Sequence, residues 1–368
     1  MPHFIKPGAV IGIIGGGVRA YHLVLAARKL GMHAIVMAPA DGDIAFEVAD
    51  MRLLGGPTDT AALQRLVALA QVITFVDENV DGTALAAVAR PEQLPSGIDI
   101  FSVTQDRYLE KVFLDDLNMN ILPYAQVVTP NDIAAAVETV GFPAILKPIQ
   151  KGIGVDQQLR LLEPEDVKRA EQLLQQRPYV LEAWLDEPTE YSVLVAKSGE
   201  TIKVMPVVEN QFSNHELRSS VVPAAGGAAV MQEIQRIARV LAEKIDYNGV
   251  FGIELFMTAS LTLYVKRIFP GPQMNGHILA ATTGISEYTM HLRALLGWPL
   301  PDVTLLRGGA LLPLRKADRA AAMTQIQIKP AWQFDFYPEG DPLIGQIAVL
   351  GDRDAIKNTI NATDYFQL

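Results

Sequence analysis

One acidic and two basic side chains occupy neighbouring strands of a predicted hairpin in the C-terminal half of the chain. The stretch YNGVFGIELFMTAS at 247–260 is typical of a strand and carries one acid, Glu254, inside an apolar run. The next stretch, LTLYVKRIFPGPQMNGH at 261–277, predicts a second strand with Lys266 and Arg267 beside that acid. Because facing side chains of adjacent strands lie in contact, this hairpin could bind a metal ion through oxygen ligands or an anion through its cations.

A second candidate site surrounds Lys147, which closes the apolar strand FPAILKP. Lys151, Gly152 and Gly154 follow within a few residues. An ammonium group and the backbone N–H groups of a glycine loop can close over the same anion, so this arrangement suits a phosphate. The alternative is a surface lysine that precedes a turn.

Two further acids, Glu182 and Glu190, lie at the ends of the segment LEAWLDEPTEY. Backbone N–H and C=O groups between them could pair with a purine ring, and a nearby carboxylate could accept hydrogen bonds from ribose hydroxyls. The alternative is a pair of solvated acids at strand ends.

A glycine run near the N-terminus joins a buried strand to a helix. The run AVIGII at 9–14 predicts the strand, GGG at 15–17 a tight turn, and Gly31 the end of the helix. The segment GGGVRA also satisfies a dinucleotide pattern, but the strand at 33–39 ends without the acid that a nicotinamide site uses for ribose. We interpret the glycines as turn formers, with a nicotinamide oxidoreductase as the alternative.

The elements that must position these residues fall into three predicted parts. Strands alternate with helices through residues 1–104, which predicts a doubly wound α/β domain with a parallel sheet. A helix with Thr104 as its N-cap opens a small α+β part at 105–186. A C-terminal part with a mostly β tail covers 187–368.

Composition excludes several classes of protein. The 368 residues suffice for a core divided over two or three domains, and the net charge of −10 argues against general nucleic-acid binding. The absence of cysteine excludes disulfides, thiolate zinc sites and cysteine nucleophiles. No apolar stretch approaches membrane-spanning length, and we expect a soluble cytoplasmic protein without a membrane partner.

The order of these features resembles the ATP-grasp architecture: a lysine strand, a glycine loop, an E-x-x-L segment, an acid and an E-L-F strand. More narrowly, the chain resembles the carboxyaminoimidazole ribonucleotide synthetase family, the ATP-dependent subunit of phosphoribosylaminoimidazole carboxylase, from about Ile11 to Leu300. The motifs that carry the resemblance are IGIIGGG, DENVD at 77–81, QDRYLEK at 105–111, GFPAILK at 141–147, EYSVLVAKSGE at 190–200, MPVVEN at 205–210, YNGVFGIELFMT at 247–258, GPQMNGH at 271–277 and HLRALLGWPL at 291–300.

The resemblance implies an ATP-grasp fold with an N-terminal Rossmann-like pre-ATP-grasp domain, a lid at 105–186 and a homodimer. It also implies a ligase reaction of purine biosynthesis that uses ATP, Mg²⁺ and bicarbonate to carboxylate aminoimidazole ribonucleotide through carboxyphosphate. The ATP-binding residues it implies are Arg107 and Lys147 at the phosphates, Glu182, Ala183, Trp184 and Leu185 at adenine, and Glu190 at ribose. Glu254 matches one magnesium ligand, and Glu78 and His277 fall in segments that face the ribonucleotide in the family.

The chain departs from the family within these same segments. The family hairpin reads like V-N-E-I-A-P-R-P-H-N-S-G-H, so Lys266 and Arg267 replace two metal ligands. The loop at 151–158 reads KGIGVDQQ where the family has G-G-Y-D-G-K-G-Q, and a basic pair of the family's tail aligns with Pro342 and Leu343. Ammonium and guanidinium groups offer no lone pair to a cation. We therefore predict that the hairpin keeps the shape of a metal site without its chemistry.

Three functions stay open at this point. The chain could perform the family reaction with a rearranged metal site. It could be a weak or silent nucleotide-binding relative with a regulatory or structural role. It could also be a ligase with another acceptor, in which the two cations bind phosphate directly.

Overall fold

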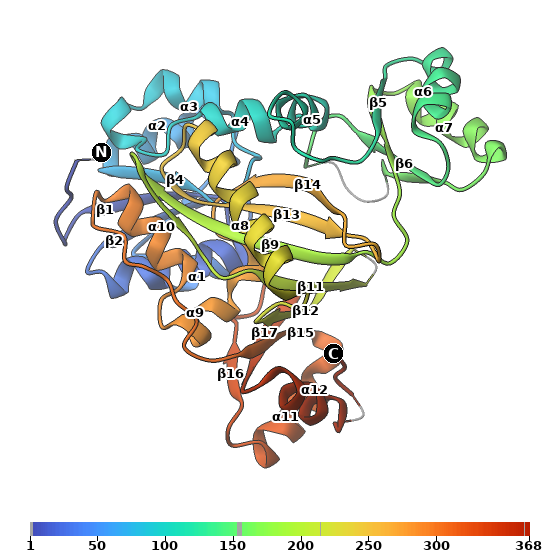
Figure 1. Cartoon of the computed structure of the whole chain (residues 1–368). Coiled ribbons are helices and arrows are strands. Elements are labelled where there is room, and N and C mark those ends of the chain that lie inside the picture. Colours follow the sequence, from blue (N-terminus) through green and yellow to red (C-terminus); the bar gives the residue numbers. More distant parts are fainter. Residues whose placement is uncertain (1–2, 153–156, 214, 364) are drawn as a thin grey trace. The chain divides into compact units, whose positions relative to one another are not determined.

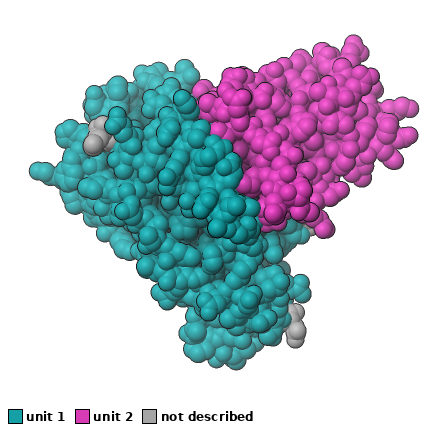
Figure 2. Space-filling view, in the orientation of Figure 1, with its two compact units in different colours: residues 1–100, 191–252, 270–368 teal, residues 101–190, 253–269 magenta. Residues whose placement is uncertain are grey.

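The computed structural model describes the chain except for residues 1–2, 153–156, 214 and 364. Contacts between residues group the chain into two compact units, coloured separately in Figure 2. Unit 1 contains residues 1–100, 191–252 and 270–368, and unit 2 contains residues 101–190 and 253–269. The division at residues 104 and 186 stays a prediction.

Unit 1 begins with a doubly wound parallel sheet, which confirms the predicted α/β fold class. Its order is β3-β2-β1-β4, and every pairing is parallel. The strands are β1 (Val10–Ile14), β2 (His33–Ala38), β3 (Met51–Leu54) and β4 (Val72–Phe75), and the helices are α1 (Gly17–Lys29), α2 (Thr60–Leu69) and α3 (Gly82–Val88) (Figure 1). All of β4, and all of β1 except Val10, are buried, as expected for a parallel sheet that is covered on both faces.

A carboxylate of the chain itself closes the glycine turn before α1. Both oxygens of Asp43 lie 3.0 Å from the Gly17 N–H that they accept. A Cβ on Gly16 would lie 1.7 Å from Asp43 Oδ2, so only glycine permits this approach. A carboxylate at this helix N-terminus takes the place that a dinucleotide phosphate would need, which favours the turn interpretation over the nicotinamide one.

A second, mostly antiparallel sheet forms the rest of unit 1. The part of this sheet that belongs to unit 1 runs in the order β9-β11-β12-β15-β17-β16, and β10 pairs with β9. They are β9 (Thr189–Ser198), β10 (Thr201–Val204), β11 (Val208–Ser213), β12 (Glu216–Val222), β15 (Gly309–Arg315), β16 (Gln333–Phe336) and β17 (Leu343–Leu350). The accompanying helices are α8 (Gly227–Lys244), α9 (Ile278–Thr283), α10 (Glu287–Leu295), α11 (Arg319–Ile328) and α12 (Arg353–Asn361). The tail, predicted to be mostly β, thus also contains α11 and α12.

Helix α10 shares a core with the N-terminal sheet, although more than 200 residues separate them in sequence. Tyr288 and Leu292 of α10 belong to the same buried cluster as Ile13 of β1 and Leu23 of α1. This packing explains why the first hundred residues and the C-terminal segment belong to one unit. Among the described residues, no helix combines the length and apolar character needed to cross a bilayer.

Unit 2 contains a four-stranded antiparallel sheet in the order β5-β8-β6-β7. The strands are β5 (Tyr124–Val127), β6 (Ala144–Pro148), β7 (Leu159–Leu161) and β8 (Tyr179–Ala183). Helices α6 (Ile133–Val140) and α7 (Val167–Leu174) pack with it around Leu146, Tyr179 and Leu181, which are fully buried. The hairpin strands β13 (Gly249–Met257) and β14 (Leu263–Pro270) contribute residues 253–269 to this unit.

The helix predicted to start after Thr104 starts two residues later. Thr104 is the last residue of α4 (Asp99–Thr104), and α5 runs over Arg107–Asp116. The N-cap of α5 is Asp106, whose carboxylate accepts the Tyr108 and Leu109 N–H groups at 2.7 and 2.9 Å. The predicted Thr104 cap was wrong because a carboxylate closer to the helix satisfies both amides.

Candidate active site

The acid and the two cations of the hairpin form one cluster in unit 2. Arg267 donates from Nε to Glu254 Oε2 at 2.8 Å and from Nη2 to Oε1 at 2.7 Å. Lys266 Nζ lies 3.2 Å from Glu254 Oε2. Burial by itself would raise the pKa of the Glu254 carboxyl, but the guanidinium and ammonium groups hold it well below its ordinary value. Glu254 is therefore an ionised, fully engaged acid.

The magnesium ion that the family resemblance implies does not fit this donor set. Mg²⁺ prefers oxygen ligands in octahedral geometry. The Glu254 carboxylate already accepts two hydrogen bonds from Arg267, and a divalent ion there would lie close to two fixed positive charges. No group of three or more His, Asp or Glu side chains in the described ranges has an arrangement suited to a metal ion.

Lys266 connects Glu254 to the acid predicted to bind ribose. Its Nζ donates to Glu190 Oε2 at 2.8 Å. The same ammonium group lies 4.8 Å from the centre of the Phe256 ring, a cation–π distance. Two carboxylates and one aromatic face thus hold this lysine in place.

Glu182, predicted at the adenine edge, pairs with the predicted phosphate lysine. Lys147 Nζ donates to Glu182 Oε2 at 2.6 Å, and Lys111 Nζ contacts Oε1. Burial would raise the pKa of the Glu182 carboxyl, but the two ammonium groups hold it well below its ordinary value. Burial also lowers the pKa of Lys147, an effect that Glu182 opposes.

Sequence reasoning missed two buried charges on α5, Glu110 and Lys111. Both are almost fully buried, at 2% and 3% exposure. Glu110 Oε1 accepts the Ile268 N–H at 2.7 Å and lies 2.8 Å from Lys151 Nζ. Lys111 Nζ also reaches Lys266 O at 3.4 Å. Both residues lie in the motif QDRYLEK, but adjacent positions of a helix point in different directions, so the pattern did not predict that both would be buried.

Arg107, the other predicted phosphate ligand, binds the backbone at the end of the lysine strand and just beyond it. Its Nη1 donates to Pro148 O at 2.6 Å and to Gln150 O at 3.1 Å. These bonds place Arg107 beside the end of β6, where Lys147 lies. The glycine loop of the second prediction is only partly described, because Gly154 lies outside the described residues.

The predicted adenine edge continues from the end of β8. Ala183 N donates to Pro123 O at 2.9 Å, and Trp184 N donates to Pro143 O at 2.9 Å. Within the described ranges, no group accepts a hydrogen bond from Leu185 N–H. Leu185 is half-buried, so its amide is the one in this segment that could donate to a purine nitrogen.

The predicted ribonucleotide residues, Glu78 and His277, lie in unit 1. The His277 ring contacts Gln346 Oε1 at 2.9 Å through Nδ1 and Tyr288 OH at 2.6 Å through Nε2. Burial lowers the pKa of His277 to about 3, so the ring is neutral. Glu78 is half-buried in the turn after β4.

A second acid missed by sequence reasoning, Glu287, lies beside His277. Its Oε1 is 3.8 Å from His277 Nε2, and the residue is 0% exposed. Neither carboxyl oxygen accepts a hydrogen bond from another described residue. Burial raises the pKa of Glu287 to about 8, so this acid keeps its proton at neutral pH.

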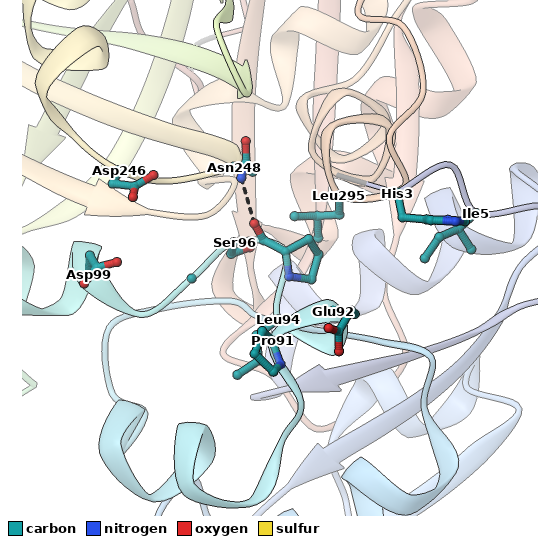
Figure 3. A pocket seen from close by; sticks show the side chains of 12 residues that line it. His3, Ile5, Pro91, Glu92, Leu94, Ser96, Asp99, Asp246, Asn248 and Leu295 are labelled. Carbon is teal, nitrogen blue, oxygen red and sulfur yellow. Dashed lines mark hydrogen bonds between the residues drawn. The ribbon is translucent and has the colours of Figure 1, made fainter. Parts of the chain in front are cut away.

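A separate pocket of about 390 Å³ in unit 1 contains none of the predicted site residues. Figure 3 shows its wall, where Asn248 Nδ2 donates to Pro95 O at 2.8 Å. Glu92, Asp99 and Asp246 line it together with apolar residues such as Leu94.

Comparison with known proteins defines the class of this fold. Residues 112–288 match the ATP-grasp domain model, and residues 9–105 match the ribonucleotide synthetase preATP-grasp domain model. These matches cover the doubly wound sheet, the four-stranded sheet and the hairpin. The chain is an ATP-grasp protein with an N-terminal pre-ATP-grasp domain.

Its relatives narrow the class to one family. The N5-carboxyaminoimidazole ribonucleotide synthase of Bacillus subtilis (strain 168) is 32% identical over 84% of this chain and 82% of its own length. The synthase of Staphylococcus saprophyticus is 30% identical over 98% of this chain and 96% of its own length. The chain belongs to the N5-carboxyaminoimidazole ribonucleotide synthase family.

Solved structures agree with this assignment. An N5-carboxyaminoimidazole ribonucleotide synthetase in complex with ADP superposes with a TM-score of 0.92 at 27% identity, over 99% of this chain and 98% of that one. The Staphylococcus aureus N5-carboxyaminoimidazole synthetase complexed with ADP gives a TM-score of 0.91 at 27% identity, over 98% of both chains.

Proposed function

We propose that the chain binds ATP in its ATP-grasp region and performs the reaction of its family. That reaction is the ATP-dependent carboxylation of aminoimidazole ribonucleotide with bicarbonate, through carboxyphosphate, in purine biosynthesis. The observation that carries the proposal is the 30–32% identity to synthases of this name over more than 80% of each chain. A homodimeric state and a cytoplasmic location belong to the same proposal and rest on resemblance.

The arrangement of unit 2 supports the nucleotide-binding part of the proposal. Lys147 lies next to the last residue of β6, beside Arg107, and two such cations suit a phosphate. The Leu185 amide follows the neighbouring strand β8, where it could donate to adenine. Glu190 follows in the chain at the position proposed for ribose, although Lys266 now pairs with it.

One observation favours a second candidate function, nucleotide binding without turnover. The Glu254 carboxylate is occupied by Arg267 and Lys266, so the residues do not fit the metal ion. Metal ions supply much of the charge neutralisation in phosphoryl transfer. A chain without that ion could still bind a nucleotide in a regulatory or structural role.

Turnover distinguishes the two candidates. Purified chain is mixed with ATP, bicarbonate and aminoimidazole ribonucleotide, and ADP release is followed with the Bacillus subtilis synthase as positive control. The family reaction predicts release that depends on the ribonucleotide at about one per second or faster. Release no faster than in the reaction without ribonucleotide would overturn it, and nucleotide binding in the same preparation would then support the second candidate.

A further inference from the structure

The Arg267 side chain is fixed by a buried acid and still reaches the surface. Two parallel hydrogen bonds to Glu254 set the plane of the guanidinium group. Glu254 is 3% exposed, whereas 41% of the Arg267 side-chain surface is accessible. A cation held in one orientation with an accessible surface is suited to binding an anion.

The charges around Arg267 also favour an anion. Lys266 contacts both Glu254 and Glu190 and remains 24% accessible. Its carbonyl oxygen lies 3.4 Å from Lys111 Nζ, which links the hairpin to the second group of charges. The ion pairs around Glu182, Glu190 and Glu254 involve four cations, Lys111, Lys147, Lys266 and Arg267.

The seven groups named above sum to one net positive charge when all of them are ionised. A site that holds a divalent cation needs an excess of negative oxygen ligands. Fixed positive groups instead repel the ion and attract nucleotide phosphates.

We infer that Arg267 and Lys266 bind the phosphates of a nucleoside di- or triphosphate directly, without a divalent metal ion. Glu254 is then a positioning residue that orients Arg267, in place of a metal ligand. This inference rests on the nucleotide binding contained in the proposed function, and it adds the form in which the nucleotide is bound.

Calorimetry of the full chain with ADP and with ATP, each in EDTA and in excess Mg²⁺, tests the inference. We expect dissociation constants in EDTA that are equal to or lower than those in Mg²⁺, because Mg²⁺ competes for the phosphates. Binding that requires Mg²⁺ would overturn the inference and leave the proposed function standing. Absence of binding under both conditions would overturn the nucleotide binding of the proposed function itself.

Variants at position 267 test whether the Arg267 side chain binds the phosphates. Arg267→Gln should weaken binding in EDTA by about tenfold or more, the usual effect of losing hydrogen bonds from a charged group. Lys168→Gln is the matched control, since it removes one charge from the exposed face of α7 and should leave binding unchanged. Arg267→Lys keeps the charge but loses the paired geometry, so an intermediate affinity supports the inference if Arg267→Gln folds poorly.

The positioning role of Glu254 is tested by the nucleotide affinity of variants at this residue and in the hairpin. Glu254→Gln should weaken metal-free binding severalfold, because Arg267 loses its anchor, while leaving the effect of Mg²⁺ small. The double variant Lys266→Asn with Arg267→Glu restores oxygen ligands and should make binding depend on Mg²⁺. A wild-type affinity in EDTA for Glu254→Gln, or for Arg267→Gln, would contradict the inference.

Discussion

The two carboxylate oxygens of Glu254 accept hydrogen bonds from one guanidinium group, that of Arg267, at 2.7 and 2.8 Å. The acid is 3% exposed, but 41% of the arginine side chain is accessible. Water can therefore hydrate the arginine if the pair is broken, whereas the acid has no such alternative. The free-energy cost of breaking the pair therefore depends on which partner is removed.

Removing Arg267 should destabilise the protein more than removing Glu254. Arg267→Gln leaves a buried carboxylate with only Lys266 nearby, and we expect a cost of about 2–4 kcal/mol. Glu254→Gln leaves an arginine that is partly hydrated, at a cost of about 1 kcal/mol. Urea unfolding of the two single variants, and of Arg267→Gln combined with Glu254→Gln, measures the difference. A larger loss for Glu254→Gln would show that the burial argument is wrong.

The depressed pKa of Glu182 should make the protein sensitive to acid. Its folded pKa lies below the ordinary value of 4.5, so its contribution to stability is present above pH 4.5 and is lost as the pH falls through the lower folded pKa. Glu182→Gln removes this titration, and its stability deficit should shrink between pH 6 and pH 3. Glu138→Gln changes an exposed acid of α6 and serves as control. A deficit that stays constant with pH for Glu182→Gln would refute the prediction.

Glu287 should have the opposite effect, because its pKa is raised from 4.5 to about 8. Its contribution to stability is fully present below pH 4.5 and is lost as the pH rises towards 8, since the unfolded chain ionises first. Glu287→Gln should be more stable than the wild type by an amount that grows by about 1.4 kcal/mol per pH unit over this range.

Urea unfolding at pH 5, 6.5 and 8 checks the Glu287 prediction. Burial also lowers the pKa of His22 to about 4 and that of His277 to about 3. Both histidines are present in the wild type and in Glu287→Gln, so most of their effect on the pH dependence of stability cancels in the comparison. An advantage of Glu287→Gln that does not grow with pH would contradict the prediction.

Alanine should destabilise the glycine turn before α1 at position 16 and should be tolerated at Gly42, in the turn that follows β2. Gly16→Ala places a methyl group 1.7 Å from Asp43 Oδ2 and must displace the carboxylate that accepts the Gly17 N–H, at a cost of about 2 kcal/mol. Gly42→Ala meets no atom within 4 Å and is the matched control, with a change below about 1 kcal/mol. The melting temperatures of Gly16→Ala and Gly42→Ala, measured by thermal unfolding, test this difference. Equal melting temperatures would contradict the requirement for glycine at position 16.

Much of the fold followed from local patterns. The apolar run at 9–14, the glycine turn and the helix that ends near Gly31 correspond to β1 and α1, because periodicity and turn residues act over a few positions. The Thr104 cap was wrong because two nearby polar residues competed for one helix start. The shared core of α1 and α10 joins segments far apart in sequence, which no local pattern reports.

The sequence by itself determined which charges are present: Glu254 followed by Lys266 and Arg267, on a chain whose motifs identify its family. It also determined that the side chains of Lys266 and Arg267 cannot ligate a cation. Only the tertiary structure decided the partners, placing Lys111 and Lys147 on Glu182, Lys151 on Glu110, and Lys266 between Glu190 and Glu254. The physical reason is that ionic contacts depend on distance in space and on burial, and both arise when α5, the four-stranded sheet and the hairpin pack together.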